Sequence, residues 1–181
     1  MGKENWIKRI GKLGVVLALG ALLAGCRENP SEKGVEYLKE GNYEKAITQF
    51  EKAIQEKIKE GDAYRGIGIA RYELGNYKEA KEALLKALEE GEKPSATFHE
   101  MLGDCELNLG EPRSALNYYR LALEGDLSKE ARAEVLLNEI AAYEQLKDWK
   151  SAKAKLEAYV KEYPDQEKAK KELEFLRTRD L

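Results

Sequence analysis

The sequence predicts an all-α protein made of about four similar helix pairs, and an internal repeat carries that prediction. Residues 41–46 read Gly-Asn-Tyr-Glu-Lys-Ala and residues 75–80 read Gly-Asn-Tyr-Lys-Glu-Ala, so the two segments lie 34 residues apart. A repeat of that length is typical of helix pairs stacked into an array. No segment has the pattern of a strand, and all the prolines fall at predicted helix boundaries: Pro30, Pro94, Pro112 and Pro164.

The first 25 residues have the composition of a signal peptide. Four basic residues between positions 3 and 12 form a positive start, and an uncharged stretch rich in Leu, Val, Ala and Gly follows over 13–25. As a helix, that stretch would reach only about 20 Å, which is less than the ~30 Å hydrocarbon core of a bilayer. We therefore expect residues 1–25 to be a secretory signal rather than a membrane-spanning helix.

The end of this leader, Leu-Ala-Gly-Cys over 23–26, resembles the lipobox of bacterial lipoproteins, in which small residues precede an obligatory cysteine. The resemblance implies cleavage between Gly25 and Cys26, and attachment of two or three acyl chains at Cys26, which anchor a protein stably. Residues 26–30 would then be a short tether, with the mature chain on the extracytoplasmic side of a bacterial membrane. Arg27 stands where an aspartate often signals inner-membrane retention, so we expect the outer membrane in a host with two membranes.

Small and large residues recur in each copy at helical spacing. The second helix of each predicted pair carries Ala, a large side chain four residues later, and a third residue, usually small, three residues beyond. Small residues let two helices approach closely, and large ones fill the space beside them. These triplets are Ala46, Phe50 and Ala53; Ala80, Leu84 and Ala87; Ala115, Tyr119 and Ala122; and Ala152, Leu156 and Tyr159. The first helices carry Gly34, Gly68, Gly103 and Ile140 at one equivalent position, whereas Gly66 has no role that the pattern explains.

This pattern resembles the tetratricopeptide repeat, a helix–turn–helix with small and aromatic residues at set positions. The copies run over 27–60, 61–94, 96–129 and 133–166, with their helices within 31–166. The resemblance implies a right-handed α-solenoid. A further helix over 165–179 is predicted to cap the last repeat, because Ala169, Leu173 and Leu176 share one stripe among charged residues.

Local signals predict where the helices begin and end. Glycine can take the left-handed conformation that ends a helix, and Asn or Asp can cap the next one. The glycines are Gly41, Gly75 and Gly110, and the caps are Asn42, Asn76, Asp148 and Asp165. The predicted helices run over 31–40, 43–59, 62–74, 77–90, 95–109, 112–124, 128–146, 148–162 and 165–179.

The resemblance also implies a groove on the concave face, lined by the first helix of each pair. The predicted partner-binding residues are Arg65, Ile69, Tyr72, Glu73, Glu100, Asp104, Leu107, Asn108, Leu137 and Glu144, and Val35, Leu38, Lys39 and Ala141 occupy further groove positions. Seven charged groove positions are acidic (Glu28, Asp62, Glu73, Glu100, Asp104, Glu134 and Glu144) and two are basic (Lys39 and Arg65). The excess predicts a protein or peptide partner with Lys or Arg beside apolar anchors. Tyr72 would contribute affinity, and the Glu73 and Asp104 rim charges would set the association rate.

We interpret the chain as a non-enzymatic, membrane-anchored adaptor that binds a protein or peptide and takes part in the assembly of an envelope complex. No catalytic motif, cofactor motif or metal-ligand spacing is recognisable, and Cys105 is expected to be a small buried side chain. Without residues 1–25 the formal charge changes from −3 to −6, which excludes nucleic acid as a partner. Two alternatives stay open: an enzyme accessory or sugar-binding protein with a groove site near His99, and a spacer that scaffolds its own oligomer.

Overall fold

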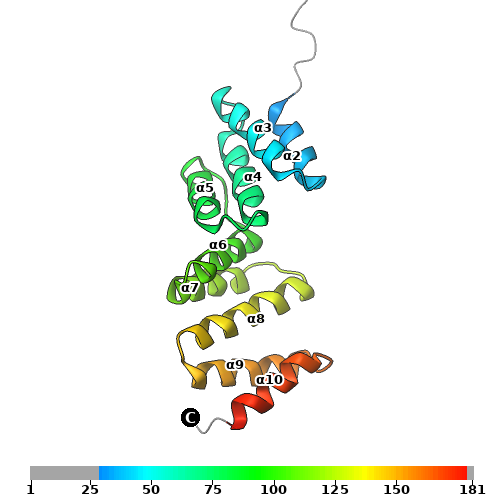
Figure 1. The fold of residues 1–181 in the computed structure, drawn as a ribbon, viewed down its shortest axis with the longest axis vertical. Coiled ribbons are helices and arrows are strands. Elements are labelled where there is room, and N and C mark those ends of the chain that lie inside the picture. Colours follow the sequence, from blue (N-terminus) through cyan, green and yellow to red (C-terminus); the bar gives the residue numbers. More distant parts are fainter. Residues whose placement is uncertain (1–28, 179–181) are drawn as a thin grey trace, which may run out of the picture.

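The structure, a computed structural model, describes residues 29–178 (Figure 1). Within that range the chain is all-α, as predicted, with nine helices and no strand. None of these helices is both long enough and apolar enough to cross a membrane. They are α2 (Pro30–Lys39), α3 (Tyr43–Gln55), α4 (Glu60–Glu73), α5 (Tyr77–Glu89), α6 (Ala96–Asn108), α7 (Pro112–Glu124), α8 (Lys129–Gln145), α9 (Trp149–Glu162) and α10 (Glu167–Thr178).

Several predictions fall on other parts of the chain. The signal peptide over 1–25, the cleavage site after Gly25, the lipidation site Cys26 and the groove position Glu28 lie outside the described residues, as does residue 179 of the predicted capping helix.

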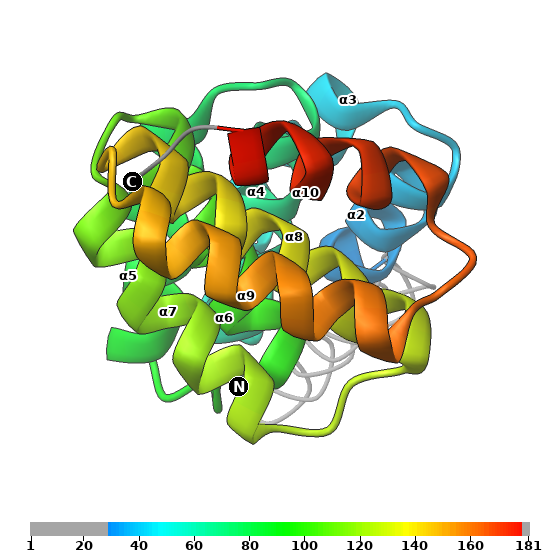
Figure 2. The ribbon, with the colours of Figure 1, turned by 90° about the horizontal axis from the view of Figure 1, so that it is seen from below.

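The helices stack in pairs into an elongated solenoid. Helix α4 packs against α5, α6 packs against α7, and each pair contacts the next. In Figure 1, α4 runs close to the long axis of the molecule whereas α8 lies nearly across it, and Figure 2 shows α10 beside α9 at the C-terminal end. Because α2 contacts α4 and α6 contacts α8, the first helices of the pairs share one side of the stack, which we call the groove face.

The predicted packing positions form the core. All seven alanines of the second-helix triplets are fully buried, and the large residues between them are at most 1% exposed. Burying these side chains gives each neighbouring pair its own apolar cluster, as expected for an array in which every repeat contacts only its neighbours. The predicted stripe of the capping helix is also buried, and α10 covers the apolar side of α9.

Glycines on the first helices receive the large side chains of the second helices. The Phe50 ring from α3 lies between Gly34 on α2 and Gly66 on α4. A Cβ atom at Gly34 would lie 2.7 Å from Phe50 Cε1, and one at Gly66 would lie 2.4 Å from Phe50 Cζ. Gly66 therefore has a clear role after all: with Gly34, it makes the slot that holds Phe50.

Three first helices end as predicted. Gly41, Gly75 and Gly110 have φ values of +73°, +74° and +79°, which is the left-handed conformation. After α2, the Gly41 amide donates to the Leu38 carbonyl (3.0 Å) and the Asn42 amide donates to the Tyr37 carbonyl (2.8 Å). These bonds satisfy carbonyls that the helix end would otherwise leave unpaired.

Other predicted helix limits are wrong. Helix α3 ends at Gln55 rather than 59, because Lys57 takes a left-handed φ of +55° and the Ile58 amide turns back to donate to the Ala53 carbonyl (2.8 Å). Ile58 then packs on the core formed by α3 and α4. The sequence has no glycine at this helix end, so the early end of α3 was not predicted.

The predicted caps behave differently from one another. Asp148 accepts a hydrogen bond from the Ser151 amide, as expected for an N-cap. Asn42 and Asn76 occupy the N-cap position, but their side chains make no capping bond. The last helix begins at Glu167, so Asp165 lies too far upstream to cap it.

Candidate binding site

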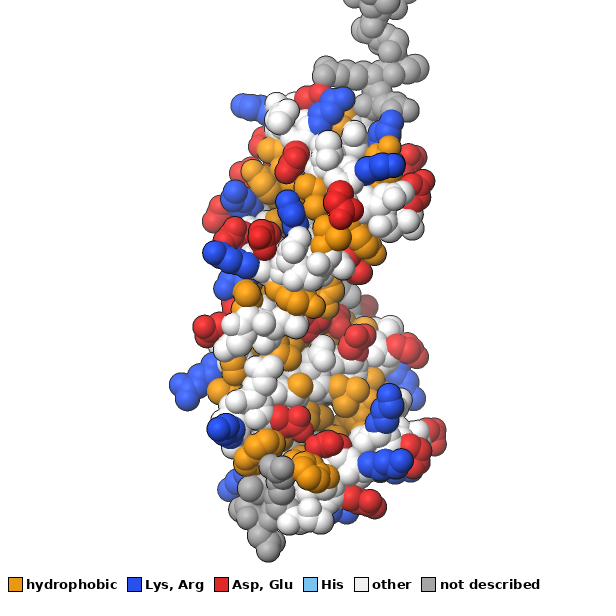
Figure 3. Space-filling model, in the orientation of Figure 1, with side chains coloured by type: hydrophobic (Ala, Val, Ile, Leu, Met, Phe, Trp, Pro, Cys, Tyr) orange, Lys and Arg blue, Asp and Glu red, His pale blue; other side chains and the backbone are white. Residues whose placement is uncertain are grey.

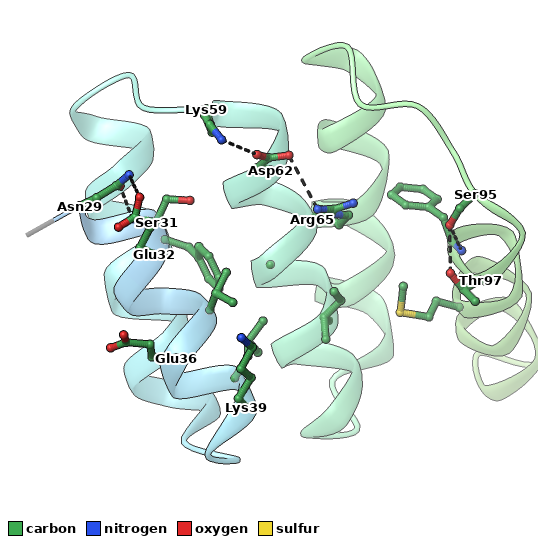
Figure 4. Close-up of a pocket in the computed structure, with 17 residues that line it drawn as sticks. Asn29, Ser31, Glu32, Glu36, Lys39, Lys59, Asp62, Arg65, Ser95 and Thr97 are labelled. Carbon is green, nitrogen blue, oxygen red and sulfur yellow. Dashed lines mark hydrogen bonds and ion pairs between the residues drawn. The ribbon is translucent and has the colours of Figure 1, made fainter.

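A hollow of about 660 Å³ lies on the groove face, lined mainly by α2, α4 and α6 (Figure 4). Its apolar lining includes Val35 and Leu38 from α2, Ile69 from α4, and Phe98 and Met101 from α6. Val35 is 41% exposed, which is unusual for a large apolar side chain in this protein. Apolar side chains gathered in a concave surface are typical of ligand sites.

One part of the lining depends on a glycine. Gly66 and Phe50 both line the hollow, although Phe50 is only 1% exposed. Since Gly66 has no side chain, the ring of Phe50 packs directly against α4 at this point. One glycine thus serves both the core and the shape of the site.

The charges around the hollow are balanced. Three lining residues are acidic (Glu32, Glu36 and Asp62) and three are basic (Lys39, Lys59 and Arg65). Along one wall, Asp62 lies 3.8 Å from both Lys59 and Arg65, as Figure 4 shows, and Arg65 also pairs with Glu92 at 2.8 Å. The predicted acidic excess is therefore absent from this part of the groove face. Figure 3 shows the same mixture on the surface, where apolar patches lie between charges of both signs.

Asp104 is not a rim charge, and that prediction is wrong. Its side chain is 8% exposed, and three neutral donors surround its carboxylate. The Tyr72 hydroxyl donates to Oδ2 at 2.8 Å, while the Tyr119 hydroxyl and the Asn138 amide donate to Oδ1 at 2.8 and 2.9 Å. These bonds join α4, α7 and α8 to α6. Asp104 has been drawn into the interior because its partners on three helices converge there.

Acidic character is concentrated farther along the groove face, on α6 and α8. Burial raises the pKa of Glu100 to about 7, and the negative charges of Asp104 and Glu134 add to the rise. Burial, followed by repulsion from Glu172 on α10, also raises the pKa of Glu144. The Oε1 atom of Glu144 is buried and has no hydrogen-bond partner within residues 29–178. The charged neighbours that act on these two carboxyl groups are all acidic.

The remaining predicted site residues are spread along the face. Glu73 is exposed and accepts a long hydrogen bond of 3.4 Å from Tyr43. Asn108 donates to the backbone carbonyl of Asp104 at 2.8 Å, and Leu107 is partly buried against the core of α7 and α8. Leu137 is 40% exposed. Of the ten predicted residues, only Arg65 and Ile69 line the hollow.

Sequence reasoning missed the contribution of α6 to the hollow. Ser95, Thr97, Phe98 and Met101 all line it, and none was predicted to. Copies two and three are separated by one extra residue, at Ser95. Ser95 caps α6 by accepting from the Phe98 amide at 3.2 Å. Met101 stands 35 residues after Gly66, which also lines the hollow, so that correspondence could have identified it.

His99 lies away from the hollow lining. Its ring stacks on Tyr118 of α7, with 6.3 Å between centroids, and burial lowers its pKa. In the part of the chain that the structure describes, no group of three or more His, Cys, Asp or Glu side chains is placed to hold a metal ion. Cys105 is fully buried, as predicted, and burial raises the pKa of its thiol to about 12.

Comparisons with known protein families agree with this arrangement of helices. Models of the tetratricopeptide repeat match residues 37–105 and residues 134–165. The chain is a tetratricopeptide-repeat protein. The first match spans α3 to α6 and so includes two helices that line the hollow, α4 and α6, whereas the second spans most of α8 and all of α9. No curated protein sequence matches the chain.

Solved structures of tetratricopeptide proteins share the fold. YrrB, described as a tetratricopeptide protein with an unusual peptide-binding site, is 22% identical and has a TM-score of 0.68, over 83% of this chain and 77% of its own. MamA from Desulfovibrio magneticus RS-1 is 17% identical and has a TM-score of 0.69, over 84% of this chain and 86% of its own. A double mutant of MamA from RS-1 gives 18% identity and a TM-score of 0.70, over 84% and 87%.

The raised pKa of Glu100 predicts how stability depends on pH. Between pH 4.5 and about 7, the folded protein holds a proton at Glu100 that the unfolded chain releases. The contribution of this group to the free energy of unfolding therefore falls as the pH rises through that window. Glu100→Gln mimics the protonated form, and we expect it to raise the free energy of unfolding by about 1–2 kcal/mol at pH 8, and by less at pH 5, after allowance for partial exposure.

Urea denaturation at both pH values measures this difference. Glu82→Gln, at an exposed position on α5, is the matched control and should change little at either pH. A gain for Glu100→Gln that is the same at pH 5 and pH 8 would contradict the assignment.

Proposed function

We propose that this tetratricopeptide protein is a lipid-anchored adaptor of the bacterial cell envelope, which binds a segment of a partner protein on its groove face. One observation carries the proposal: a hollow of about 660 Å³, lined in part by apolar side chains, lies on the face formed by the first helices. Tetratricopeptide arrays present extended surfaces of this kind to their partners. The description of YrrB as having a peptide-binding site supports a peptide-like ligand here.

The chemistry of the groove face suggests the kind of segment. Val35, Ile69 and Met101 offer apolar surface in the hollow, which suits one or two apolar side chains of the partner. Farther along, the carboxyl groups of Glu100 and Glu144 are partly buried among acidic neighbours. A Lys or Arg side chain would relieve that repulsion. We therefore propose a partner segment with an apolar anchor at one end and basic residues toward the other.

The anchor is proposed from the lipobox over 23–26. Asn29 lines the hollow and stands three residues after Cys26, so acyl chains on Cys26 would hold the hollow close to the bilayer. A site in that position suits assembly of an envelope complex, at the outer membrane where the host has two membranes.

Replacing the proposed lipidation site tests the anchor. Cys26→Ser is expected to leave the precursor uncleaved after Gly25 and without acyl label, because the sulfur that accepts the lipid is gone. Metabolic labelling with radioactive palmitate, followed by electrophoresis of membrane fractions, measures both effects. Cys105→Ser is the matched control and should still be labelled. A labelled Cys26→Ser protein of mature size would overturn the lipoprotein proposal.

Site-specific crosslinking tests binding at the groove face. A photoreactive amino acid at Ile69 lies in the hollow, whereas the same group at Glu82 lies at an exposed position on a second helix. In native membranes, we expect position 69 to give a discrete crosslinked product and position 82 to give none. The yield at position 69 should fall with rising salt if basic residues of the partner contribute to association. Products at position 82 alone would move the interface away from the groove face.

A further inference from the structure

The groove face contains one wide joint. Helices α2 and α4 approach closely, and so do α6 and α8, whereas α4 and α6 do not. The loop over 91–95, with Gly91 in a left-handed conformation (φ +87°), separates the second pair from the third. The hollow has walls on both sides of this joint, since Ile69 lies on α4 and Met101 lies on α6.

Among residues 29–178, one side-chain hydrogen bond links α4 to α6 on the groove face, while the Lys81 ammonium of α5 donates to Glu106 of α6 at 3.0 Å between the same two helix pairs. Tyr72 comes from α4 and Asp104 from α6, and the hydroxyl lies 2.8 Å from the carboxylate. Tyr72 is supported from its own side by an edge-to-face contact with the ring of Tyr77, at 5.8 Å between centroids. Asp104 is held from the other side by Tyr119 and Asn138. Each partner is thus fixed to its own half of the solenoid.

The position of this bond relates it to the hollow. Tyr72 stands three residues after Ile69 on α4, and Asp104 stands three residues after Met101 on α6. Residues three apart on a helix are neighbours on one face. The Tyr72–Asp104 bond therefore crosses the joint one helical turn beyond the two apolar side chains that line the hollow from either side.

We infer that the Tyr72–Asp104 hydrogen bond is a strut that sets the width of the hollow, with Asp104 as its positioning residue. Apolar contacts can slide, but a charge-assisted hydrogen bond requires a particular distance and direction. The carboxylate orients one oxygen toward Tyr72 because Tyr119 and Asn138 occupy the other. The strut itself does not depend on the proposed function. Only its consequence does, namely that a partner would bind to a hollow of fixed width.

Distance measurements across the joint test the strut without any partner. Spin labels are attached through a ketone-bearing amino acid at Glu51 on α3 and Asn117 on α7, both exposed, so that Cys26 and Cys105 stay unchanged. The full chain in detergent is measured by double electron–electron resonance. Tyr72→Phe removes the hydroxyl and keeps the ring, and we expect the distance distribution to shift or broaden. Tyr119→Phe is the matched control, since it removes one donor to Asp104 while Asn138 still holds the same oxygen and the link across the joint stays in place.

The outcomes distinguish a bond that sets the spacing of the two helix pairs from one that only contributes to the stability of the fold. Circular dichroism confirms that each variant is folded at the temperature of measurement. A Tyr72→Phe distribution identical to that of the parent overturns the inference, and so does equal broadening by Tyr119→Phe. If crosslinking at Ile69 fails in the parent protein while Tyr72→Phe still broadens the distances, the strut stands and the proposed binding function falls.

Discussion

Phe50→Ala is expected to lower the free energy of unfolding by about 3–5 kcal/mol, the usual cost of deleting a buried aromatic side chain. The Phe50 ring is 1% exposed and fills the slot between Gly34 and Gly66, so its removal leaves a cavity against two backbones that cannot close it easily. Urea denaturation followed by circular dichroism measures the loss. The hollow should change shape as well, because Phe50 is part of its lining.

The slot itself supplies the control for this prediction. Gly66→Ala places a Cβ atom where the ring now lies and should cost about 1–3 kcal/mol by overpacking. In the double variant with Phe50→Ala, that second loss should largely disappear, because the ring that clashes is gone. Residues in contact show such non-additivity, whereas distant ones do not. Losses that simply add would show that Phe50 does not occupy the slot beside Gly66.

A buried charge at position 115 should be as damaging as the loss of Phe50. Ala115 is fully buried in the cluster that joins α7 to α8, and it has Tyr119, Val135 and Ala142 around it. A carboxylate there would be buried among apolar side chains, so Ala115→Asp is expected to cost at least about 3 kcal/mol. Thermal melts measure the loss, and hydrogen exchange should localise it to α7 and α8, since repeats depend on their nearest neighbours.

The same charge two residues away is the matched control for Ala115→Asp. Asn117 is exposed on α7, so Asn117→Asp should change stability by no more than about 0.5 kcal/mol. If the two variants melt alike, the tight packing of the second helices would be wrong for the third repeat.

The balance of charges around the hollow affects which partner segments would bind under the proposed function. A uniformly acidic groove would attract any basic segment, and its rim charges would act mainly on the rate of association. The charges that line the hollow are balanced, whereas Glu100 and Glu144, which are partly buried near other acidic groups, lie on α6 and α8. In the proposed binding mode, specificity would depend on the order of residues along the segment, because its apolar anchor and its basic residues would have to reach the two regions together.

The sequence alone determined the helices, the repeat and most of the core. Ala87 and Ala122 are buried as predicted because small residues at helical spacing have one physical use, the close approach of two helices. Gly75 ends its helix as predicted because its left-handed conformation is a local property of the backbone. Features of this kind depend on residues only a few positions apart, so the sequence of one protein is enough to predict them.

The tertiary structure alone decided the site. Gly66 acquired its role only when Phe50 was placed against it, and Asp104 became a buried acceptor only when Tyr72 and Asn138 were brought to it from repeats more than 30 residues away. Phe98 and Met101 of α6 line the hollow together with Val35 of α2, which lies more than 60 residues earlier in the sequence. Burial and hydrogen bonding of a groove side chain depend on the spacing between neighbouring repeats, and that spacing is set by packing across the array rather than by the pattern within any one repeat.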